Sequence, residues 1–220
     1  MKRIFLLFAA GSLAFAACQS APNADKAEAT DAKTVTTVTG NTYKADLAQS
    51  RLEWVGTKPV GKHHGTIALK EGSLMVDNNM LTGGKFIADM TTLKADDQDS
   101  TGNAKLGGHL MSPDFFDTAK FPTADFEVTS VKAGVDTAGG NKILMTDATH
   151  TITGNLTLKG VTKSISFPAK VVITDPTVTA DANFNIDRTQ WGLVYGNDKG
   201  LGDKFIHPEV NLTLHIVANK

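Results

Sequence analysis

Apolar and polar residues alternate along most of the chain after residue 41. A period of two predicts β-strands with one buried face, whereas an amphipathic helix has a period of 3.6. In the last such segment, residues 209–218, every second residue from Val210 to Ile216 is aliphatic. The chain is therefore predicted to be all-β. The other predicted strands cover residues 51–57, 66–70, 74–76, 81–93, 121–133, 142–152, 155–158, 162–174 and 178–187.

Residues that favour turns separate these predicted strands. They are Glu71-Gly72, Asp77-Asn78-Asn79, Gly139-Gly140, Gly154-Asn155 and Asp175-Pro176. Many short antiparallel strands indicate a closed barrel or a sandwich. We favour an antiparallel β-barrel, because an up-and-down meander of about eight strands can close on itself and leave no exposed edge.

One stretch interrupts the strand pattern with a helical signal. Residues 109–126 read HLMSPDFFDTAKFPTADF, and within them Ser112-Pro113-Asp114 has the composition of a helix start. We expect one or two short helices near residues 104–117. Phe115 and Phe116 are expected to face the barrel interior near one end, as an end cap.

The first residues have the features of a bacterial export signal. Residues 1–17 begin with Lys2 and Arg3 and continue with an apolar run that is too short to span a bilayer comfortably. Small residues precede Cys18, the only cysteine, as in a lipobox, so we expect Cys18 to be lipidated. Ordinary signal-peptidase cleavage is the alternative. Lipidation would hold a periplasmic or surface lipoprotein at a membrane, and Gln19 favours the outer membrane by analogy.

The rest of the chain divides into a tether and one domain. Residues 18–40 would form the lipidated cysteine and a disordered tether, because they contain no aromatic residue and little apolar surface. Residues 41–220 would form a single barrel. With Cys18 in the anchor no disulfide can form within the domain, so a hydrophobic core must hold it together.

The charge of the chain argues against nucleic acid as a partner. The formal net charge is −1, and removing a leader that carries Lys2, Arg3 and no acidic residue changes it to −3. The lysines are scattered singly, without a basic stripe or interleaved aromatic residues.

Neither a metal nor a cofactor is expected. His63 and His64 are adjacent, so on a strand their side chains point to opposite faces and cannot chelate together. The other four histidines have no metal-binding spacing. The acidic loop that begins at Asp97 resembles a calcium loop, but its twelfth position is Gly108 rather than the required glutamate.

No catalytic residues are predicted, and the protein is not expected to be an enzyme. The sequence contains no Gly-x-Ser-x-Gly motif, no phosphate-binding glycine loop and no cysteine within the domain. His109 with Asp114 and Asp117 is the alternative that remains open, as an acid–base cluster that acts on a lipid or quinone. An aspartate at a helix start is explained more simply by the helix dipole.

Three stretches resemble the signature blocks of YceI-like proteins. They are residues 109–126, residues 154–169 (GNLTLKGVTKSISFPA) and residues 184–193 (FNIDRTQWGL), and His63-His64-Gly65 resembles a lipoprotein branch of this family. The resemblance spans roughly residues 41–220, and it implies a lipocalin-like barrel that binds polyisoprenoids or other long-chain lipids in its interior. The most specific matches are Leu110, Ser112, Asp114, Phe115, Phe116, Asp117, Leu158 and Gly160 to Lys163.

One departure limits what the resemblance implies. Residues 101–105 lack the Arg-Asp pair usual in this family, so a head-group role assigned to that pair in relatives has no counterpart here. Arg188 is the remaining head-group candidate, as a donor to a lipid phosphate or carbonyl, although an ion pair with a nearby carboxylate is the simpler role.

The expected function is that of a carrier, store or scavenger of a long-chain lipid, of polyisoprenoid or fatty amide type, in the cell envelope. The alternatives are the enzyme described above and a ligand-free structural or stress protein with a filled barrel. A homodimer is left open. Large apolar residues are the candidate ligand contacts. With Arg188, they are Trp54, Phe86, Phe115, Phe116, Phe126, Phe184, Trp191 and Tyr195.

Overall fold

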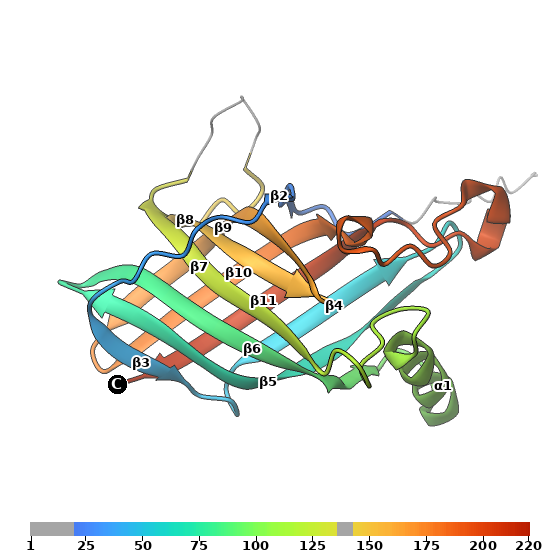
Figure 1. Ribbon diagram of the computed structural model, residues 1–220, viewed down its shortest axis with the longest axis horizontal. Coiled ribbons are helices and arrows are strands. Elements are labelled where there is room, and N and C mark those ends of the chain that lie inside the picture. The colour runs from blue at the N-terminus through green and yellow to red at the C-terminus, as the bar shows by residue number, and fades with distance from the viewer. Residues whose placement is uncertain (1–19, 136–142) are drawn as a thin grey trace, which may run out of the picture.

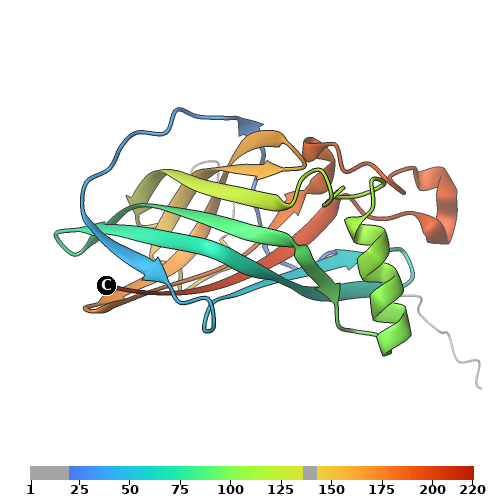
Figure 2. The same cartoon turned by 60° about the horizontal axis from the view of Figure 1, so that its bottom comes forward.

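A computed structural model describes residues 20–135 and 143–220 of the chain. Eight strands form a closed antiparallel barrel, in which each strand pairs with the next and the last pairs with the first (Figures 1 and 2). This confirms the predicted fold class. The strands are β4 (Arg51–Thr57), β5 (Lys62–Asp77), β6 (Met80–Ala95), β7 (Thr123–Ala133), β8 (His150–Leu158), β9 (Val161–Thr174), β10 (Thr177–Asp187) and β11 (Glu209–Asn219). Strand β3 (Asn41–Ala45) lies in line with β4 and also pairs with β5 and β11.

The helical elements gather at one end of the barrel. Helix α1 (Ser100–Met111) packs against β6 there, and the 3₁₀ helices η1 (Arg188–Trp191) and η2 (Lys199–Lys204) lie in the connection between β10 and β11 (Figure 2). We call this end the α1 end. In the described part of the chain, no helix has the length and apolar character needed to cross a membrane.

A short helix overlaps residues 104–117, as predicted, but the predicted helix start at Ser112 is wrong. Helix α1 begins after Asp99, whose carboxylate accepts a hydrogen bond from the N–H of Gly102 at 2.7 Å, and Ser112 is its C-cap. Because a residue before proline is driven away from helical angles, Pro113 holds Ser112 in an extended conformation with ψ of 168°. The Ser-Pro-Asp sequence therefore ends a helix here, and the start signal was Asp99.

Two glycines that were read as turn signals lie inside strands. Gly72 is within β5 and Gly154 is within β8. A Cβ atom on Gly72 would lie 2.4 Å from Cδ1 of Phe86, and one on Gly154 would lie 2.4 Å from Cζ of Phe126. Each glycine thus makes room for a phenyl ring of the neighbouring strand, so the turns predicted at these two positions are wrong. For the same reason, the predicted segments 66–70 and 74–76 are parts of one strand.

Two other turn predictions are confirmed. Asn78 and Asn79 connect β5 to β6 with positive φ angles of 47° and 61°, which asparagine tolerates better than most residues. Asp175-Pro176 connects β9 to β10. Gly139-Gly140 lies outside the described residues. The strand predicted to begin at residue 142 begins at His150 in the structure.

Residues 20–40, for which the composition predicts a disordered tether, contain two short strands that pair with the barrel. Strand β1 (Asp25–Lys26) pairs in parallel with β10, and β2 (Thr30–Asp31) pairs with β9. Strands β9 and β10 pair with each other only over residues 170–174 and 177–181, so β1 and β2 lie where these strands separate. We call residues 20–40 the strap.

The strap is held by main-chain groups that composition does not reveal. The carboxylate of Asp25 accepts hydrogen bonds from the N–H groups of Leu144 and Met145 at 2.9–3.1 Å. Ala27 is only 2% exposed and belongs to the core of the barrel. A segment poor in apolar residues is ordered here because two strand edges offer it hydrogen-bonding partners.

The barrel is filled at the end opposite α1. Tyr43, Val76, Val178 and Ala218 are all buried there, and the hydroxyl of Tyr43 donates a hydrogen bond to Asp175 at 3.2 Å. These side chains belong to the core and do not line the internal cavity described next. The open interior therefore lies toward the α1 end.

Candidate functional site

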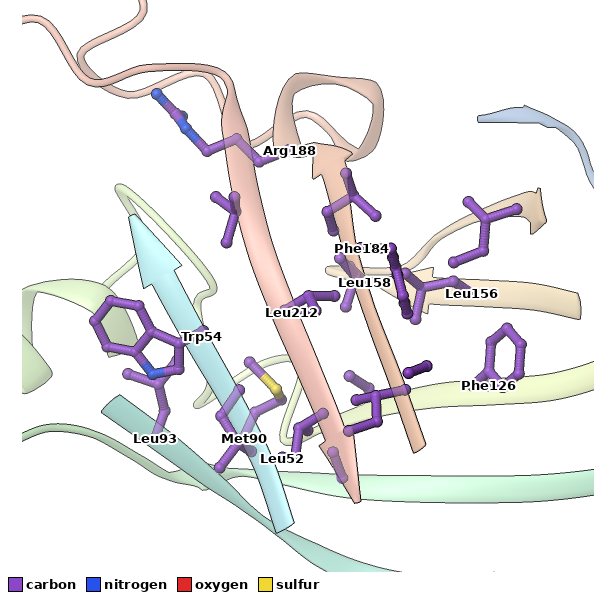
Figure 3. A pocket seen from close by; sticks show the side chains of 18 of the residues that line it. Leu52, Trp54, Met90, Leu93, Phe126, Leu156, Leu158, Phe184, Arg188 and Leu212 are labelled. Atoms are coloured by element: carbon purple, nitrogen blue, oxygen red, sulfur yellow. The ribbon is translucent and has the colours of Figure 1, made fainter. Parts of the chain in front are cut away.

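An apolar cavity of about 440 Å³ lies inside the barrel (Figure 3). The inward-facing residues of the barrel strands form its walls, and this size falls within the range of roughly 300–1,000 Å³ that is typical of small-molecule sites. Its wall includes Leu52, Met90, Leu93, Leu156, Leu158 and Leu212, which Figure 3 shows around a common space. The alternation of apolar residues along each strand creates this apolar interior.

Eight of the nine predicted ligand contacts line the cavity, namely Trp54, Phe86, Phe115, Phe116, Phe126, Phe184, Arg188 and Tyr195. The ninth, Trp191, does not line it. Its side chain is 1% exposed, and its Nε1 donates a hydrogen bond to the carbonyl of Leu156 at 2.9 Å. Trp191 is thus a structural residue, and the binding role of the other eight stays a prediction.

Phe115 and Phe116 face the barrel interior at the α1 end, as predicted. Both line the cavity, and Phe115 is 6% exposed. The turn that follows α1 places them, because the N–H of Phe116 donates to the carbonyl of Leu110 and that of Phe115 donates to Ser112, each at 3.0 Å. The end of the helix therefore directs two phenyl rings toward the lumen.

His109, Phe115 and Tyr195 form an aromatic cluster at the same end. The ring of His109 meets those of Phe115 and Tyr195 edge to face, with centroids 5.2 and 4.8 Å away. The cluster joins α1 to the connection between β10 and β11. Nε2 of His109 lies 3.6 Å from a carboxylate oxygen of Asp114, and both side chains are largely exposed. Exposed ion pairs of this kind contribute little to the stability of the fold.

Arg188 is a structural clamp at the α1 end. It is 4% exposed, and its guanidinium donates to main-chain carbonyls. Burial lowers the pKa of Arg188, and the nearby charge of Asp187 opposes this effect. Its guanidinium donors hold the chain that connects η1 to β11, which differs from the ion pair considered from the sequence, and a head-group role for Arg188 stays a prediction. The carbonyls belong to His207 (3.2 Å), Tyr195 (3.0 Å), Ile206 (2.9 Å) and Leu193.

The hairpin of β4 and β5 supplies polar groups that the sequence did not single out. Thr57, Lys58 and His63 line the cavity at the α1 end, and Nδ1 of His63 lies 2.9 Å from a carboxylate oxygen of Asp97. His64, the adjacent residue, does not line the cavity, which confirms that the two histidines point to opposite faces. Thr57 and Lys58 could have been found from the sequence, because they lie at the end of a predicted strand that has one inward face.

In residues 20–135 and 143–220, no three His, Cys, Asp or Glu side chains are grouped so that they could hold a metal ion. The cavity itself is mostly apolar, with polar lining residues that include Thr57, Lys58 and His63.

A family model described as a YceI-like domain matches residues 43–218. This chain belongs to the YceI-like family. Among curated proteins, it is 37% identical to a UPF0312 protein of Pseudomonas aeruginosa over 102 residues, which are 46% of this chain and 45% of that protein. It is 34% identical to protein YceI of Escherichia coli O157:H7 over 109 residues, 50% of this chain and 49% of that protein. The alignments span about half the length of these relatives.

Two solved structures share the fold of this YceI-like chain. BcnA of Burkholderia cenocepacia superposes with a TM-score of 0.55 at 22% identity, covering 80% of this chain and 99% of that one. A polyisoprenoid binding domain from Saccharophagus degradans, implicated in plant cell wall breakdown, superposes with a TM-score of 0.55 at 16% identity, covering 80% and 97%. At these identities the likeness concerns the fold.

Proposed function

We propose that this YceI-like protein binds a long-chain apolar lipid, of polyisoprenoid or fatty amide type, inside its barrel. The observation that carries the proposal is the apolar cavity of about 440 Å³, which is filled by core residues at one end and reaches partly exposed residues such as Tyr195 at the other. The described binding of a polyisoprenoid by the Saccharophagus degradans domain, which has the same fold, supports it.

The energy of such binding comes from the hydrocarbon chain. Each CH₂ group that leaves water contributes about 0.8 kcal/mol. A chain of a few isoprene units can therefore reach micromolar affinity, about −8 kcal/mol, after the costs of association. Few polar contacts are needed, which agrees with the mostly apolar lining.

In the proposal, the protein acts as a carrier, store or scavenger in the cell envelope, held to a membrane by acyl chains on Cys18. The position of the strap supports this arrangement. The carbonyl of Pro22 accepts a hydrogen bond from Nδ2 of Asn185 at 2.9 Å, three residues from Arg188 at the α1 end. Because an extended chain spans about 3.5 Å per residue, Cys18 can lie at most about 14 Å from Pro22. The anchor would then bring the open end of the cavity close to the lipid surface.

The binding function is tested by native mass spectrometry of protein purified from membranes and of delipidated protein reloaded with polyprenols. Ala182 lines the cavity and is 5% exposed, so Ala182→Phe would fill part of the lumen. We expect it to weaken polyprenol binding at least about tenfold. Thr179→Phe, on the same strand but on the outer face, is the matched control. Equal binding by both variants, or a wild-type protein that takes up no lipid, would refute the proposal.

The anchor is tested separately by replacing Cys18 with alanine. We expect the wild-type protein to partition with membranes and its mature N-terminus to carry acyl chains, and the variant to lose both properties. A soluble wild-type protein without acyl mass would refute the anchored carrier while leaving lipid binding intact.

A further inference from the structure

Two tryptophans of the barrel differ in how their indole N–H groups are used. Nε1 of Trp191 donates to a main-chain carbonyl, whereas Nε1 of Trp54 is buried and has no hydrogen-bond partner among the described residues. The side chain of Trp54 is 9% exposed. Leaving a buried donor unpaired costs about 1–3 kcal/mol, and buried tryptophans usually find a partner for this group. The unpaired donor of Trp54 therefore needs an explanation.

The indole of Trp54 lies at the cavity. Trp54 is one of the cavity-lining side chains, and Figure 3 shows it extending from β4 near the edge of the space. Gly56, the next inward residue on the strand, leaves space open beside the six-membered ring of the indole, since a Cβ there would meet only Cζ3 of Trp54 at 4.0 Å. A group that enters the cavity can thus approach the six-membered ring of this indole.

Further polar groups lie on the same hairpin. The hydroxyl of Thr57 is buried, lines the cavity and is likewise without a partner among the described residues. Lys58 follows it, and His63 pairs across the hairpin with Gly56, so it shares the inward face of β4. Four of the five N–H donors of Arg188 are already bound to main-chain carbonyls. Among the described residues, the two cavity-lining side chains with a buried, unpartnered polar atom, Trp54 and Thr57, thus both lie on β4.

An isolated water molecule explains this arrangement less well than a ligand does. An ordered buried water makes two to four hydrogen bonds to polar groups. The lining is mostly apolar. The oxygen atom of a lipid, in contrast to a water molecule, needs only one donor, such as Nε1 of Trp54.

We propose that the β4–β5 hairpin is the head-group site of the cavity, and that Trp54 Nε1 donates a hydrogen bond to an oxygen atom at the polar end of the bound lipid. This inference rests on the proposed lipid-binding function and narrows the ligand to an oxygenated long-chain lipid, such as a prenyl alcohol, ester or ketone. The hydrocarbon chain then extends from the hairpin toward Phe126 and Phe184.

The test compares lipids that share a carbon skeleton and differ in one oxygen atom. Delipidated protein is titrated with phytol and with phytene, the matching hydrocarbon. We expect the wild type to bind phytol more tightly. Trp54→Phe, which keeps an aromatic ring and removes the N–H, should weaken phytol binding about tenfold and change phytene binding less than about twofold. Trp191→Phe is the matched control, because its N–H has a structural partner, and the ratio of the two affinities should not change.

The outcomes separate the head-group site from the lipid-binding function. If the wild type binds both lipids and Trp54→Phe weakens both alike, or neither, then the head-group site is refuted and lipid binding stands. If the wild type binds neither lipid, lipid binding itself fails and the head-group site falls with it.

Discussion

The backbone N–H of Ala27 donates a hydrogen bond to the carbonyl oxygen of Asn185 at 2.8 Å. The side-chain amide of Asn185 also binds the strap, through the carbonyl of Pro22. Both bonds lie where β9 and β10 no longer pair with each other. A segment with the composition of a linker thus pairs with β9 and β10 where these two strands separate.

Replacing Ala27 with aspartate should therefore destabilise the whole domain. The buried position offers no partner for a charge, so we expect the free energy of unfolding to fall by about 3 kcal/mol in urea titrations. Ala32→Asp, at an exposed position of the same strap, should change it by less than about 0.5 kcal/mol. Equal effects of the two substitutions would show that the strap does not contribute to the folded wall.

Replacing Gly72 with alanine should force a methyl group against the ring of Phe86. We expect a loss of about 1–3 kcal/mol in unfolding free energy, as in other overpacked cores. Combining it with Phe86→Leu should recover part of that loss, because the double variant removes the clash. Gly108→Ala is the control. Nothing lies within 4 Å of the new methyl group in α1, so it should stabilise the protein by about 0.5–1 kcal/mol.

Replacing Arg188 with lysine should release the connection between β10 and β11. A lysine ammonium cannot reproduce the planar fork that reaches carbonyls from both sides, so buried acceptors lose their partners. We expect a loss of about 2–4 kcal/mol in unfolding free energy and faster proteolysis between residues 193 and 207. Arg51→Lys, at an exposed position on β4, is the control. Unchanged proteolysis in Arg188→Lys would contradict the clamp.

Burial lowers the pKa of the His150 imidazole below its ordinary value of 6.5. The neutral ring is then favoured in the folded state, and the unfolded chain binds a proton more readily. The contribution to stability is complete above about pH 6.5 and is lost as the pH falls below it. In urea midpoints measured between about pH 5 and pH 8, His150→Gln should flatten the acid side of the curve. An identical slope in wild type and variant would contradict this assignment.

Replacing Gly56 with leucine should block the cavity beside Trp54. Because the space there is open, the leucine should fit without a backbone shift. The free energy of unfolding should therefore change by less than about 1 kcal/mol. Lipid affinity should fall at least about tenfold. Val55→Leu, the next residue on the opposite face of β4, should bind lipid like the wild type. Normal lipid binding by the Gly56→Leu variant would show that the ligand does not lie beside this hairpin.

The period-two pattern identified most of the strands from the sequence, and with them the barrel. It also identified the aromatic residues that line the cavity, such as Phe126 and Phe184, because the inward face of a strand is a local property of the chain. The roles of Gly72 and Gly154 could not be predicted in this way. A glycine can mark a turn or a position where an aromatic ring packs against the strand. Which of the two applies depends on the residue that lies opposite on another strand.

The same limit applies to the strap and to the two tryptophans. Residues 25–31 are ordered by strands β9 and β10, which are more than 130 residues away along the chain. Trp54 and Trp191 have identical side chains, and only the fold decides that one indole N–H meets a carbonyl and the other is buried without a partner. Alternation along the chain determined which residues face inward, whereas the three-dimensional packing decided which of their polar atoms have a hydrogen-bond partner.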